Sequence, residues 1–255
     1  MTTNAINPAS LPLSGKAAIV TGGARGIGAA IVRRLARDGA AVAFTYAGSR
    51  KAAEAIAADI EAEGGRALAI QADSADAGAL TAAIDQVAST FGRLDVLVNN
   101  AGVALMGELD AFPLEDLDRT LAVNVRAVFV AVQAAARHMS NGSRIVTIGS
   151  TNAERMPWAG GAVYAMSKAA IVGLTRGLAR DLGPRGITIN NVQPGPTATD
   201  MNPADGPMAG NMHDLMALER HARPEEVAGM VAYLVGPEAG MVTGASLLID
   251  GGFAA

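Results

Sequence analysis

The sequence predicts an α/β protein in which seven strands form one doubly wound parallel sheet with helices on both faces. Apolar runs too short for helices alternate along the chain with longer segments of helical period. Such alternation is typical of a parallel sheet that helices cover on both faces. No internal repeat, low-complexity tract or linker interrupts the 255 residues, so residues 15–255 are expected to form a single domain.

The expected strands are short runs rich in Ala, Val and Ile, at residues 17–20, 41–45, 67–71, 96–99, 143–148, 187–192 and 246–249. The expected helices repeat apolar residues at helical spacing, at residues 27–37, 50–63, 75–91, 114–139, 163–182 and 224–234. Asp38-Gly39 and Gly64-Gly65 should end the first two helices, because glycine readily adopts the left-handed conformation that closes a helix. Pro224, followed by two glutamates, is typical of a first helical turn.

Composition excludes several classes of function. The net charge of −4 supplies no positive field for a nucleic-acid backbone, so no nucleic-acid partner is expected. With no cysteine and three histidines, neither a disulfide framework nor a metal site is expected. Half of the residues are hydrophobic and 17% are charged, against a typical value of about 25%, which indicates extensive burial, including burial between subunits.

No segment predicts targeting or membrane insertion. Residues 1–14 contain neither a basic cluster nor an apolar run, so a disordered lead-in is expected there rather than a secretory signal or transit peptide. Charged or turn residues interrupt every apolar stretch before the roughly 18 residues that a membrane span requires. We therefore expect a cytoplasmic protein with no membrane contact.

A glycine-rich turn follows the first expected strand. Residues 21–28 read Thr-Gly-Gly-Ala-Arg-Gly-Ile-Gly and lie between that strand and an amphipathic helix. Gly22, Gly26 and Gly28 would let the backbone approach a pyrophosphate at the N-terminus of the helix. A tight turn without a ligand is the alternative. The position after a strand favours a Rossmann-type dinucleotide site, outside the carboxyl ends of the strands.

Tyr164 and Lys168 are one helical turn apart and share a helix face. A phenol with a pKa near 10 is a poor proton carrier at neutral pH, but a nearby ammonium favours the phenolate and lowers that pKa. The pair therefore indicates acid–base chemistry. A surface tyrosine beside a lysine is the alternative interpretation of these two residues alone.

Together these motifs resemble the short-chain dehydrogenase/reductase family, in particular its NADP-dependent 3-oxoacyl-(acyl carrier protein) reductases. The glycine turn, the segment Asn99-Asn100-Ala101-Gly102 and the Tyr-x-x-x-Lys pair occur in the family's order, and the resemblance covers residues 14–252. It implies hydride transfer between a nicotinamide and a carbonyl or secondary alcohol. Tyr164 would donate the proton to the carbonyl oxygen, Ser150 would polarise the carbonyl, and Lys168 would bind the nicotinamide ribose and lower the tyrosine pKa.

The resemblance assigns the remaining site residues as well. Asn124, in an expected helix, would hold a water that relays protons to the lysine. A segment that begins at Pro194 would contact the carboxamide, and Asp73 would contact adenine, with an ordinary polar turn as the alternative for Asp73. The cofactor contacts implied are Gly22, Arg25, Gly26, Ile27, Gly28, Tyr46, Ala47, Ser49, Arg50, Asp73, Ser74, Asn100, Ala101, Gly102, Tyr164, Lys168, Pro194, Gly195, Thr197 and Thr199.

The end of the second strand predicts NADP(H) as the cofactor. NAD enzymes of this fold hold the ribose 2′-hydroxyl with an acidic side chain there, but residues 44–50 contain no acid. Ser49, Arg50 and Arg25 can instead donate hydrogen bonds to a 2′-phosphate, which a carboxylate would repel. A solvated surface charge is the alternative for either arginine.

Two hydroxyls compete for the carbonyl. The family's commonest pattern has a serine thirteen residues before the tyrosine, whereas Ser150 lies fourteen residues before Tyr164 and Thr151 lies thirteen before it. Ser150 is favoured because it directly follows the fifth strand, and because the loop at residues 157–161 easily absorbs one extra residue. For both hydroxyls, a local hydrogen bond to the backbone is the alternative.

An NADPH-dependent carbonyl reductase or alcohol dehydrogenase is the leading hypothesis. A non-catalytic NADP-binding regulatory protein of the same fold, or a protein for another nucleotide-like ligand such as S-adenosylmethionine, is the alternative. Apolar helices at 121–139 and 163–182 predict a homotetramer. Residues 196–223 are expected to form a mobile lid over a small-molecule substrate, unless their methionines simply pack in a small core helix; these are Met201, Met208, Met212 and Met216.

Overall fold

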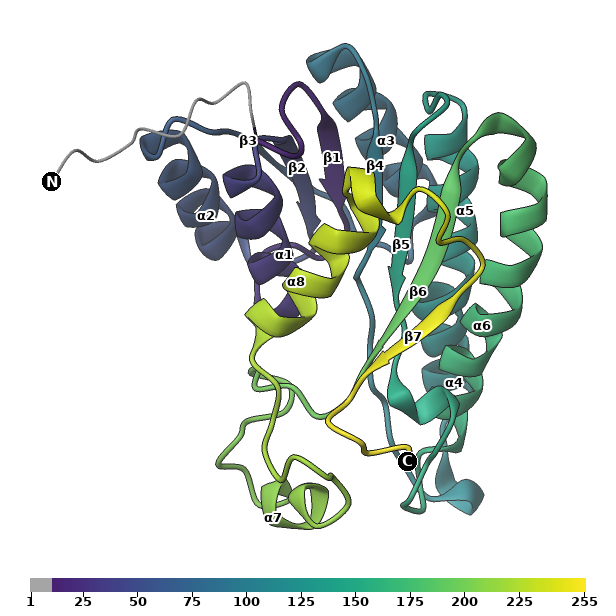
Figure 1. Ribbon diagram of the computed structural model, residues 1–255. Coiled ribbons are helices and arrows are strands. Elements are labelled where there is room, and N and C mark those ends of the chain that lie inside the picture. Colours follow the sequence, from purple (N-terminus) through teal and green to yellow (C-terminus); the bar gives the residue numbers. More distant parts are fainter. Residues whose placement is uncertain (1–10) are drawn as a thin grey trace, which may run out of the picture.

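The computed structural model describes residues 11–255, and a seven-stranded parallel sheet forms its centre (Figure 1). The strand order is β3-β2-β1-β4-β5-β6-β7, so the chain order reverses between β1 and β4. Ligands of such sheets bind outside the carboxyl ends of the strands at this reversal. The predicted fold class is confirmed. The strands are β1 (Ala17–Val20), β2 (Ala41–Tyr46), β3 (Arg66–Gln71), β4 (Val96–Asn99), β5 (Arg144–Ile148), β6 (Thr188–Pro194) and β7 (Ser246–Ile249).

Helices cover both faces of the sheet (Figure 1). One face carries α1 (Gly26–Arg37), α2 (Arg50–Ala62) and α8 (Pro224–Val235). The other carries α3 (Ala77–Phe91), α4 (Leu114–Leu121), α5 (Ala127–Ala136) and α6 (Ala162–Leu182). The short helix α7 (Ala209–His213) lies beyond the sheet, near the carboxyl ends of the strands, as Figure 1 shows.

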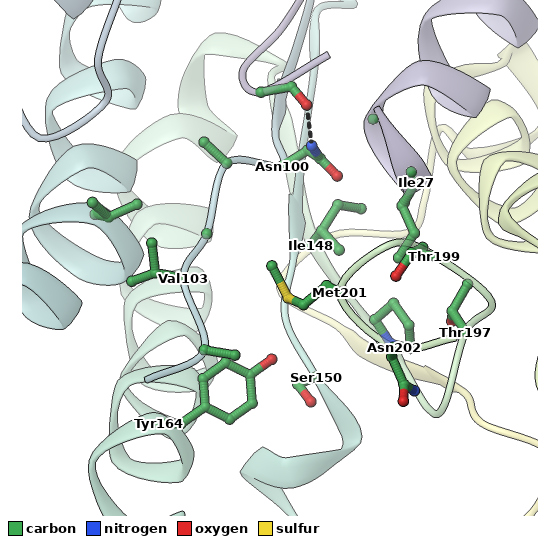
Figure 2. Close-up of a pocket in the computed structure, with 18 of the residues that line it drawn as sticks. Ile27, Asn100, Val103, Ile148, Ser150, Tyr164, Thr197, Thr199, Met201 and Asn202 are labelled. Carbon is green, nitrogen blue, oxygen red and sulfur yellow. Dashed lines mark hydrogen bonds between the residues drawn. The ribbon is translucent and has the colours of Figure 1, made fainter. Parts of the chain in front are cut away.

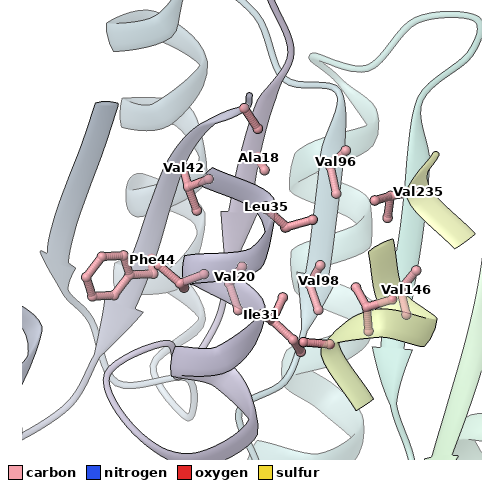
Figure 3. Packing of buried hydrophobic residues seen from close by; sticks show 14 of the residues in the cluster. Ala18, Val20, Ile31, Leu35, Val42, Phe44, Val96, Val98, Val146 and Val235 are labelled. Carbon is pink, nitrogen blue, oxygen red and sulfur yellow. The ribbon is translucent and has the colours of Figure 1, made fainter. Parts of the chain in front are cut away.

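The core on the α1 face fixes the helix that follows the glycine turn. Ile31 and Leu35 are one turn apart on α1, and both are fully buried against Val20 and Val98 of the central strands (Figure 3). Helix α8 packs beside α1 and adds Val235 to the same cluster. Each such side chain stabilises the fold by about 1.5–3 kcal/mol when fully buried. The start of α1 is therefore held firmly at the carboxyl end of β1.

The predicted helix at 114–139 is interrupted in the structure. A π turn at Ala122–Arg126 separates α4 from α5, with the Ala127 N–H bonded to the Ala122 carbonyl, and α5 ends at Ala136. Helix α3 likewise begins later than predicted, at Ala77, because the Asp76 carboxylate accepts hydrogen bonds from two N–H groups of the first turn at 2.9 and 3.0 Å.

The other element ends match the prediction or differ from it by one or two residues. Strand β6 begins one residue later than expected and continues to Pro194, which brings the start of the following segment to the sheet edge. Residues 11–14 are not a free lead-in: Leu13 is buried, and its N–H donates to the Asp38 carbonyl at 2.9 Å. The rest of the expected lead-in, residues 1–10, lies outside the described residues.

The helical stretch Leu114–Ala136 is, by length and composition, apolar enough to cross a membrane. Half of it is buried inside the fold, where Ala131 and Val132 of α5 join the core cluster that α3 completes. Charged residues such as Asp118 and Arg126 interrupt it on its outer side. Its hydrophobicity is that of a helix packed in a protein core.

Candidate active site

A cavity of about 730 Å³ opens outside the carboxyl ends of the central strands. One end is lined by the glycine turn, the end of β2 and the residues that follow β3. The other end is lined by the residues after β5, the first turns of α6, the segment after β6 and the C-terminal residues. Figure 2 shows side chains from these segments converging on one space. The cavity lies where the strand order predicts a ligand.

The glycine turn, which we call the cradle, has no space for side chains at Gly22, Gly26 and Gly28. Gly22 has a φ of +66° and Gly26 a φ of +52°, conformations that favour glycine. A Cβ on Gly28 would clash with the Gly22 carbonyl oxygen and the Asn100 side chain. The backbone can therefore approach a ligand closely at the N-terminus of α1, whose free N–H groups favour an anion.

Side chains from neighbouring strands hold this turn in place. The Asn100 side-chain amide donates to the carbonyls of Thr21 and Gly22 at 3.0 and 2.9 Å (Figure 2). The Thr21 hydroxyl accepts hydrogen bonds from the N–H groups of Asn100 and Ala101, and the Thr45 hydroxyl accepts from Gly22 N–H at 3.1 Å. Neither threonine was predicted as part of the site, although each ends a strand beside the turn.

Of the two arginines predicted to bind a 2′-phosphate, one lines the cavity and the other does not. Arg25 is exposed and lines the cavity, as do Tyr46, Ala47 and Ser49 after β2. Arg50 does not line it: its guanidinium donates to the Gln71 side chain at 2.7 Å and lies 3.6 Å from the Glu54 carboxylate. Arg50 begins α2, so its side chain runs along that helix toward the residue one turn on. Its predicted contact with the cofactor stays a prediction.

Asp73 and Ser74 line the cavity after β3, as predicted. The Asp73 carboxylate accepts a hydrogen bond from Ala75 N–H at 2.9 Å and pairs with Arg119 at 3.1 Å. The hydrogen bond from Ala75, and then the Arg119 guanidinium, keep the pKa of Asp73 below its ordinary value despite partial burial. Arg119 was not singled out in the sequence, because no motif marks its position on α4.

Tyr164 and Ser150 face the same space in the other half of the cavity (Figure 2). Tyr164 projects from the first turn of α6, and Ser150 follows β5. Burial raises the pKa of the Tyr164 phenol, and a hydrogen bond with the Ser150 side chain acts in the opposite direction. The phenol is therefore protonated at neutral pH.

Lys168 lies one turn further along α6 and is buried. Its Nζ donates to the Ile148 carbonyl at 3.0 Å and lies 5.8 Å from the centre of the Tyr164 ring. Burial lowers the pKa of Lys168 to about 8. The expected lowering of the tyrosine pKa by this lysine is not observed, because burial dominates the pKa of Tyr164.

Ser150 and Thr151 point to different partners. The Ser150 hydroxyl accepts a hydrogen bond from Asn152 N–H at 3.1 Å and still faces the cavity. The Thr151 hydroxyl donates to the buried Asp250 carboxylate at 2.9 Å. Of the two, Ser150 has the geometry that the role beside Tyr164 requires.

Asn124 does not line the cavity. It lies in the π turn, where its side-chain oxygen accepts from Val103 N–H and its amide donates to the Val103 carbonyl, both at 2.9 Å. The amide also donates to the Ser167 hydroxyl at 3.0 Å. With these bonds the side chain ties the loop after β4 to α6, and the predicted role of Asn124 in holding a water stays a prediction.

The segment after β6 covers the cavity from the α8 side. Pro194, Gly195, Thr197 and Thr199 line it as predicted, and the Thr197 hydroxyl donates to the Gly195 carbonyl at 3.0 Å. Of the four methionines predicted for a lid, three line the cavity: Met201, Met208 and Met212. Met216 does not; it is buried, close to Gly251.

Several lining residues were not predicted. They are apolar side chains from loops far apart in the sequence, and no motif marks them. They include Met106, Met156, Trp158 and Phe253.

The chain matches one family model and many known proteins. The model described as enoyl-(acyl carrier protein) reductase matches residues 22–254. Among curated proteins, the chain is 54% identical over 242 residues to the cyclic-di-GMP-binding biofilm dispersal mediator protein of Escherichia coli (strain K12), covering 95% of this chain and 98% of that protein.

Two solved structures resemble the whole fold. A short-chain dehydrogenase/reductase from Serratia marcescens BCRC 10948 is 64% identical, with a TM-score of 0.95, covering 96% of this chain and 100% of that one. A short-chain dehydrogenase from Burkholderia cenocepacia J2315, in complex with NADP, is 58% identical at the same TM-score and coverage.

Proposed function

The chain belongs to the short-chain dehydrogenase/reductase family, and we propose that it is an NADP(H)-dependent oxidoreductase that interconverts a ketone or aldehyde with the corresponding alcohol. One observation carries the proposal: Tyr164 and Ser150 face a single space, with Lys168 behind them, in the cavity whose opposite end is the glycine cradle. A proton donor and a dinucleotide cradle in one cavity suit hydride transfer to a carbonyl.

The lining residues fit a dinucleotide. The turn of Gly22, Gly26 and Gly28 is packed too closely against its neighbours for side chains, and it lies at a helix N-terminus that favours a pyrophosphate. Asp73 and Ser74 would border the adenine, and the residues from Pro194 to Thr199 would border the nicotinamide. NADP(H), when bound, supplies or accepts the hydride. The NADP complex of the relative from Burkholderia cenocepacia supports this choice of cofactor.

The proton chemistry belongs to the chain's own residues. The Ser150 and Tyr164 hydroxyls would bind the carbonyl oxygen between them, and Tyr164 would donate its proton to that oxygen as the carbonyl carbon is reduced. The raised pKa of Tyr164 keeps the phenol protonated and ready to donate. The Lys168 ammonium would stabilise the phenolate left after proton transfer and hold the nicotinamide ribose. In the reverse direction, Tyr164 would accept the proton from the alcohol.

The phosphate-recognising residue would be Arg25 rather than Arg50. Arg25 lines the cavity and makes no ion pair among residues 11–255 of the structure, whereas Arg50 is engaged by Glu54 and Gln71. The Ser49 hydroxyl lines the same wall and can add a hydrogen bond. Without a carboxylate at the end of β2, the 2′-phosphate of NADP(H) would not be repelled there.

A non-catalytic regulatory role is the second candidate. The relative from Escherichia coli is described as a cyclic-di-GMP-binding mediator, and 54% identity makes a binding role worth testing. A protein that had lost catalysis would be free to lose its tyrosine or lysine, yet Tyr164 and Lys168 are both present and face the cavity. Calorimetric titration with cyclic di-GMP, beside an assay of NADPH oxidation, separates the two candidates.

The decisive test follows NADPH oxidation with a panel of ketones, using the wild type and Tyr164→Phe. We expect turnover by the wild type and a loss of about 10²-fold or more in kcat for the variant, because the change removes the proton and little volume. The Kd for NADPH should stay within about twofold, since the cradle is untouched. Equal turnover by the variant would refute the proton-donor role.

We also propose that the protein is a cytoplasmic homotetramer. Helices α5 and α6 expose Phe129 and Met166, 45% and 46% accessible, on faces where solvent would favour polar residues. Light scattering at micromolar concentration tests the assembly, and a monomer there would contradict it.

A further inference from the structure

The catalytic half of the cavity is lined by sulfur-containing and aromatic side chains. They come from the loop after β4, the loop before α6, the segment after β6 and the C-terminal residues. Tyr164 and Ser150 alone would suffice for proton transfer, so these side chains bear on what is bound. They are Met106, Met156, Trp158, Met208, Met212 and Phe253.

Contacts connect four of these side chains, or their neighbours in the chain, to the loop between Ser150 and α6. The Met156 sulfur lies 3.9 Å from the Asn152 amide, and Asn152 is hydrogen-bonded to Ser150. The Trp158 and Phe253 rings lie 5.9 Å apart between centres, tilted by 53°. The loop of Met106 is held here too, because the next residue donates its N–H to the Gly160 carbonyl at 3.0 Å.

The charged side chains that line the cavity lie elsewhere or are engaged. Arg25 belongs to the glycine turn, and Asp73 pairs with Arg119 beyond β3. Lys168 donates to the Ile148 carbonyl. Asp200, on the segment after β6, is the remaining charged lining residue among those the structure describes, and it would repel an anion.

Resting on the proposed reductase function, we infer that the substrate is a neutral, apolar carbonyl compound, with an aryl group that contacts Trp158, whose ring packs against Phe253. Methionines adapt to varied apolar shapes, and aromatic rings pack favourably edge to face or offset. A sugar would set hydroxyls against the methionine and aromatic side chains, and a coenzyme A thioester would bring phosphates to a wall where the described residues offer them no unpaired cation.

Phe253 is a positioning residue in this proposal, because it supports the ring of Trp158. Phe253 is 1% exposed, and its carbonyl accepts a hydrogen bond from the Arg155 guanidinium at 2.8 Å. The same guanidinium lies 5.9 Å from the ring centre. The Asp250 carboxylate accepts from the next residue, Ala254 N–H, at 3.0 Å. The ring is therefore held in a fixed place before any substrate binds, which favours selective binding.

The first arm of the test compares three carbonyl compounds with NADPH: acetophenone, erythrulose and acetoacetyl-coenzyme A. We expect kcat/KM for acetophenone to exceed that for each of the others by about tenfold or more, as the aromatic contacts predict. Comparable or better use of erythrulose or the thioester would overturn the inference while leaving the proposed reductase function intact.

The second arm uses Phe253→Ala. We expect KM for acetophenone to rise about tenfold, and KM for 2-butanone, which is too small to need the aromatic wall, to stay within about twofold. Phe253→Leu keeps an apolar side chain, so its KM for acetophenone should lie between those of the wild type and Phe253→Ala. Phe91→Ala removes the same atoms at the far end of α3 and should change neither constant. Unchanged acetophenone KM in Phe253→Ala would refute the role of the ring.

Fluorescence gives a readout that does not depend on turnover. Trp158 is the chain's single tryptophan, so its emission reports on this half of the cavity alone. Saturable quenching of the Trp158 emission by acetophenone, but not by erythrulose, would support the apolar site. If such quenching occurred but no ketone were reduced, the proposed function would fail and the inference about the site would stand. If acetophenone leaves both the emission and NADPH unchanged, the inference is wrong.

Discussion

The Thr151 hydroxyl donates a 2.9 Å hydrogen bond to the buried Asp250 carboxylate, ninety-nine residues away in the chain. This bond joins the turn after β5 to the C-terminal residues that line the cavity. It also engages the Thr151 hydroxyl, while the neighbouring Ser150 faces the phenol. One residue of offset thus separates a hydroxyl suited to catalysis from one that supports the structure.

Substitution of the two hydroxyls should therefore have opposite effects. We expect Ser150→Ala to lower kcat by about 10²-fold, the scale for one lost hydrogen bond to a developing oxyanion, with little change in stability. Thr151→Val should change kcat by less than about threefold but lower the free energy of unfolding by about 1–3 kcal/mol, because a buried carboxylate loses a donor. Steady-state kinetics and urea denaturation measure both quantities. The reverse ranking in kcat would transfer the catalytic role to Thr151.

Preference for NADPH should depend on Arg25. We expect kcat/KM for NADPH to exceed that for NADH by at least about tenfold, equivalent to about 1.4 kcal/mol, which is modest for a charge-assisted contact to phosphate. Arg25→Ala should remove most of this preference by raising KM for NADPH. Arg50→Ala is the matched control and should leave the preference within about twofold, since Arg50 is turned toward Gln71. Equal use of both cofactors by the wild type would count against the prediction.

The pH dependence of carbonyl reduction should report the buried lysine. Burial lowers the pKa of Lys168 to about 8, so its ammonium is present below that pH and lost above it. We expect kcat/KM for reduction, which reflects the free enzyme, to fall about tenfold per pH unit above about 8. Lys168→Arg keeps its charge at higher pH, so any activity it retains should not show this fall. A wild-type profile that stays flat well above pH 8 would rule out this role for the ammonium.

Two histidines in the segment after β6 should make it sensitive to acid. His213 Nε2 and His221 Nδ1 lie 2.7 Å apart, and the buried Nε2 of His221 has no hydrogen-bond partner among residues 11–255. Burial, and then the charge of His213, lower the pKa of His221. The folded segment therefore binds a proton less readily than the unfolded chain, and its stability is lost as the pH falls below the ordinary value of about 6.5.

Hydrogen exchange measures this effect together with the predicted lid motion. Exchange over residues 208–223 should accelerate between about pH 7.5 and about pH 5.5, after correction for the intrinsic rate, and should slow when NADPH and a ketone are added. His221→Gln removes the titrating group and should abolish the acid-dependent acceleration. Uniform protection from exchange at every pH, with and without ligands, would contradict both the lid motion and the acid sensitivity that His221 is expected to cause.

Sequence reasoning succeeded where a local pattern decides the structure. The glycine turn and the Tyr164–Lys168 pair were recognisable because their function depends on neighbours a few residues away, on one turn or one helix face. The π turn was not recognisable in this way, because an asparagine in a helical segment does not reveal that the Val103 backbone lies beside it. The orientation of Arg50 was not predictable for a similar reason: a guanidinium near a strand end can extend in either direction, and in this structure it lies near Glu54.

The side chains that face the substrate could not be predicted from the sequence, for a different reason. Trp158 and Phe253 meet at 5.9 Å although almost a hundred residues separate them in the chain. Neither residue belongs to a motif, and only the sheet order, with β7 next to β6, brings the C-terminal residues to the end of β5. Such a contact is a property of the tertiary fold, which no short window of sequence contains.

The π turn at Ala122–Arg126 restricts how this chain can vary in length. A π turn contains one residue more than the α-helical turn it replaces, so a single deletion there would restore a continuous, well-bonded helix. The following residues of α5 would keep their orientation relative to α4, because the extra residue is absorbed within the turn, but the residues of the turn itself would shift. Asn124 could then no longer reach Val103 and Ser167 together. A deletion that local helix energetics would tolerate would thus uncouple the loop after β4 from the helix that carries Tyr164.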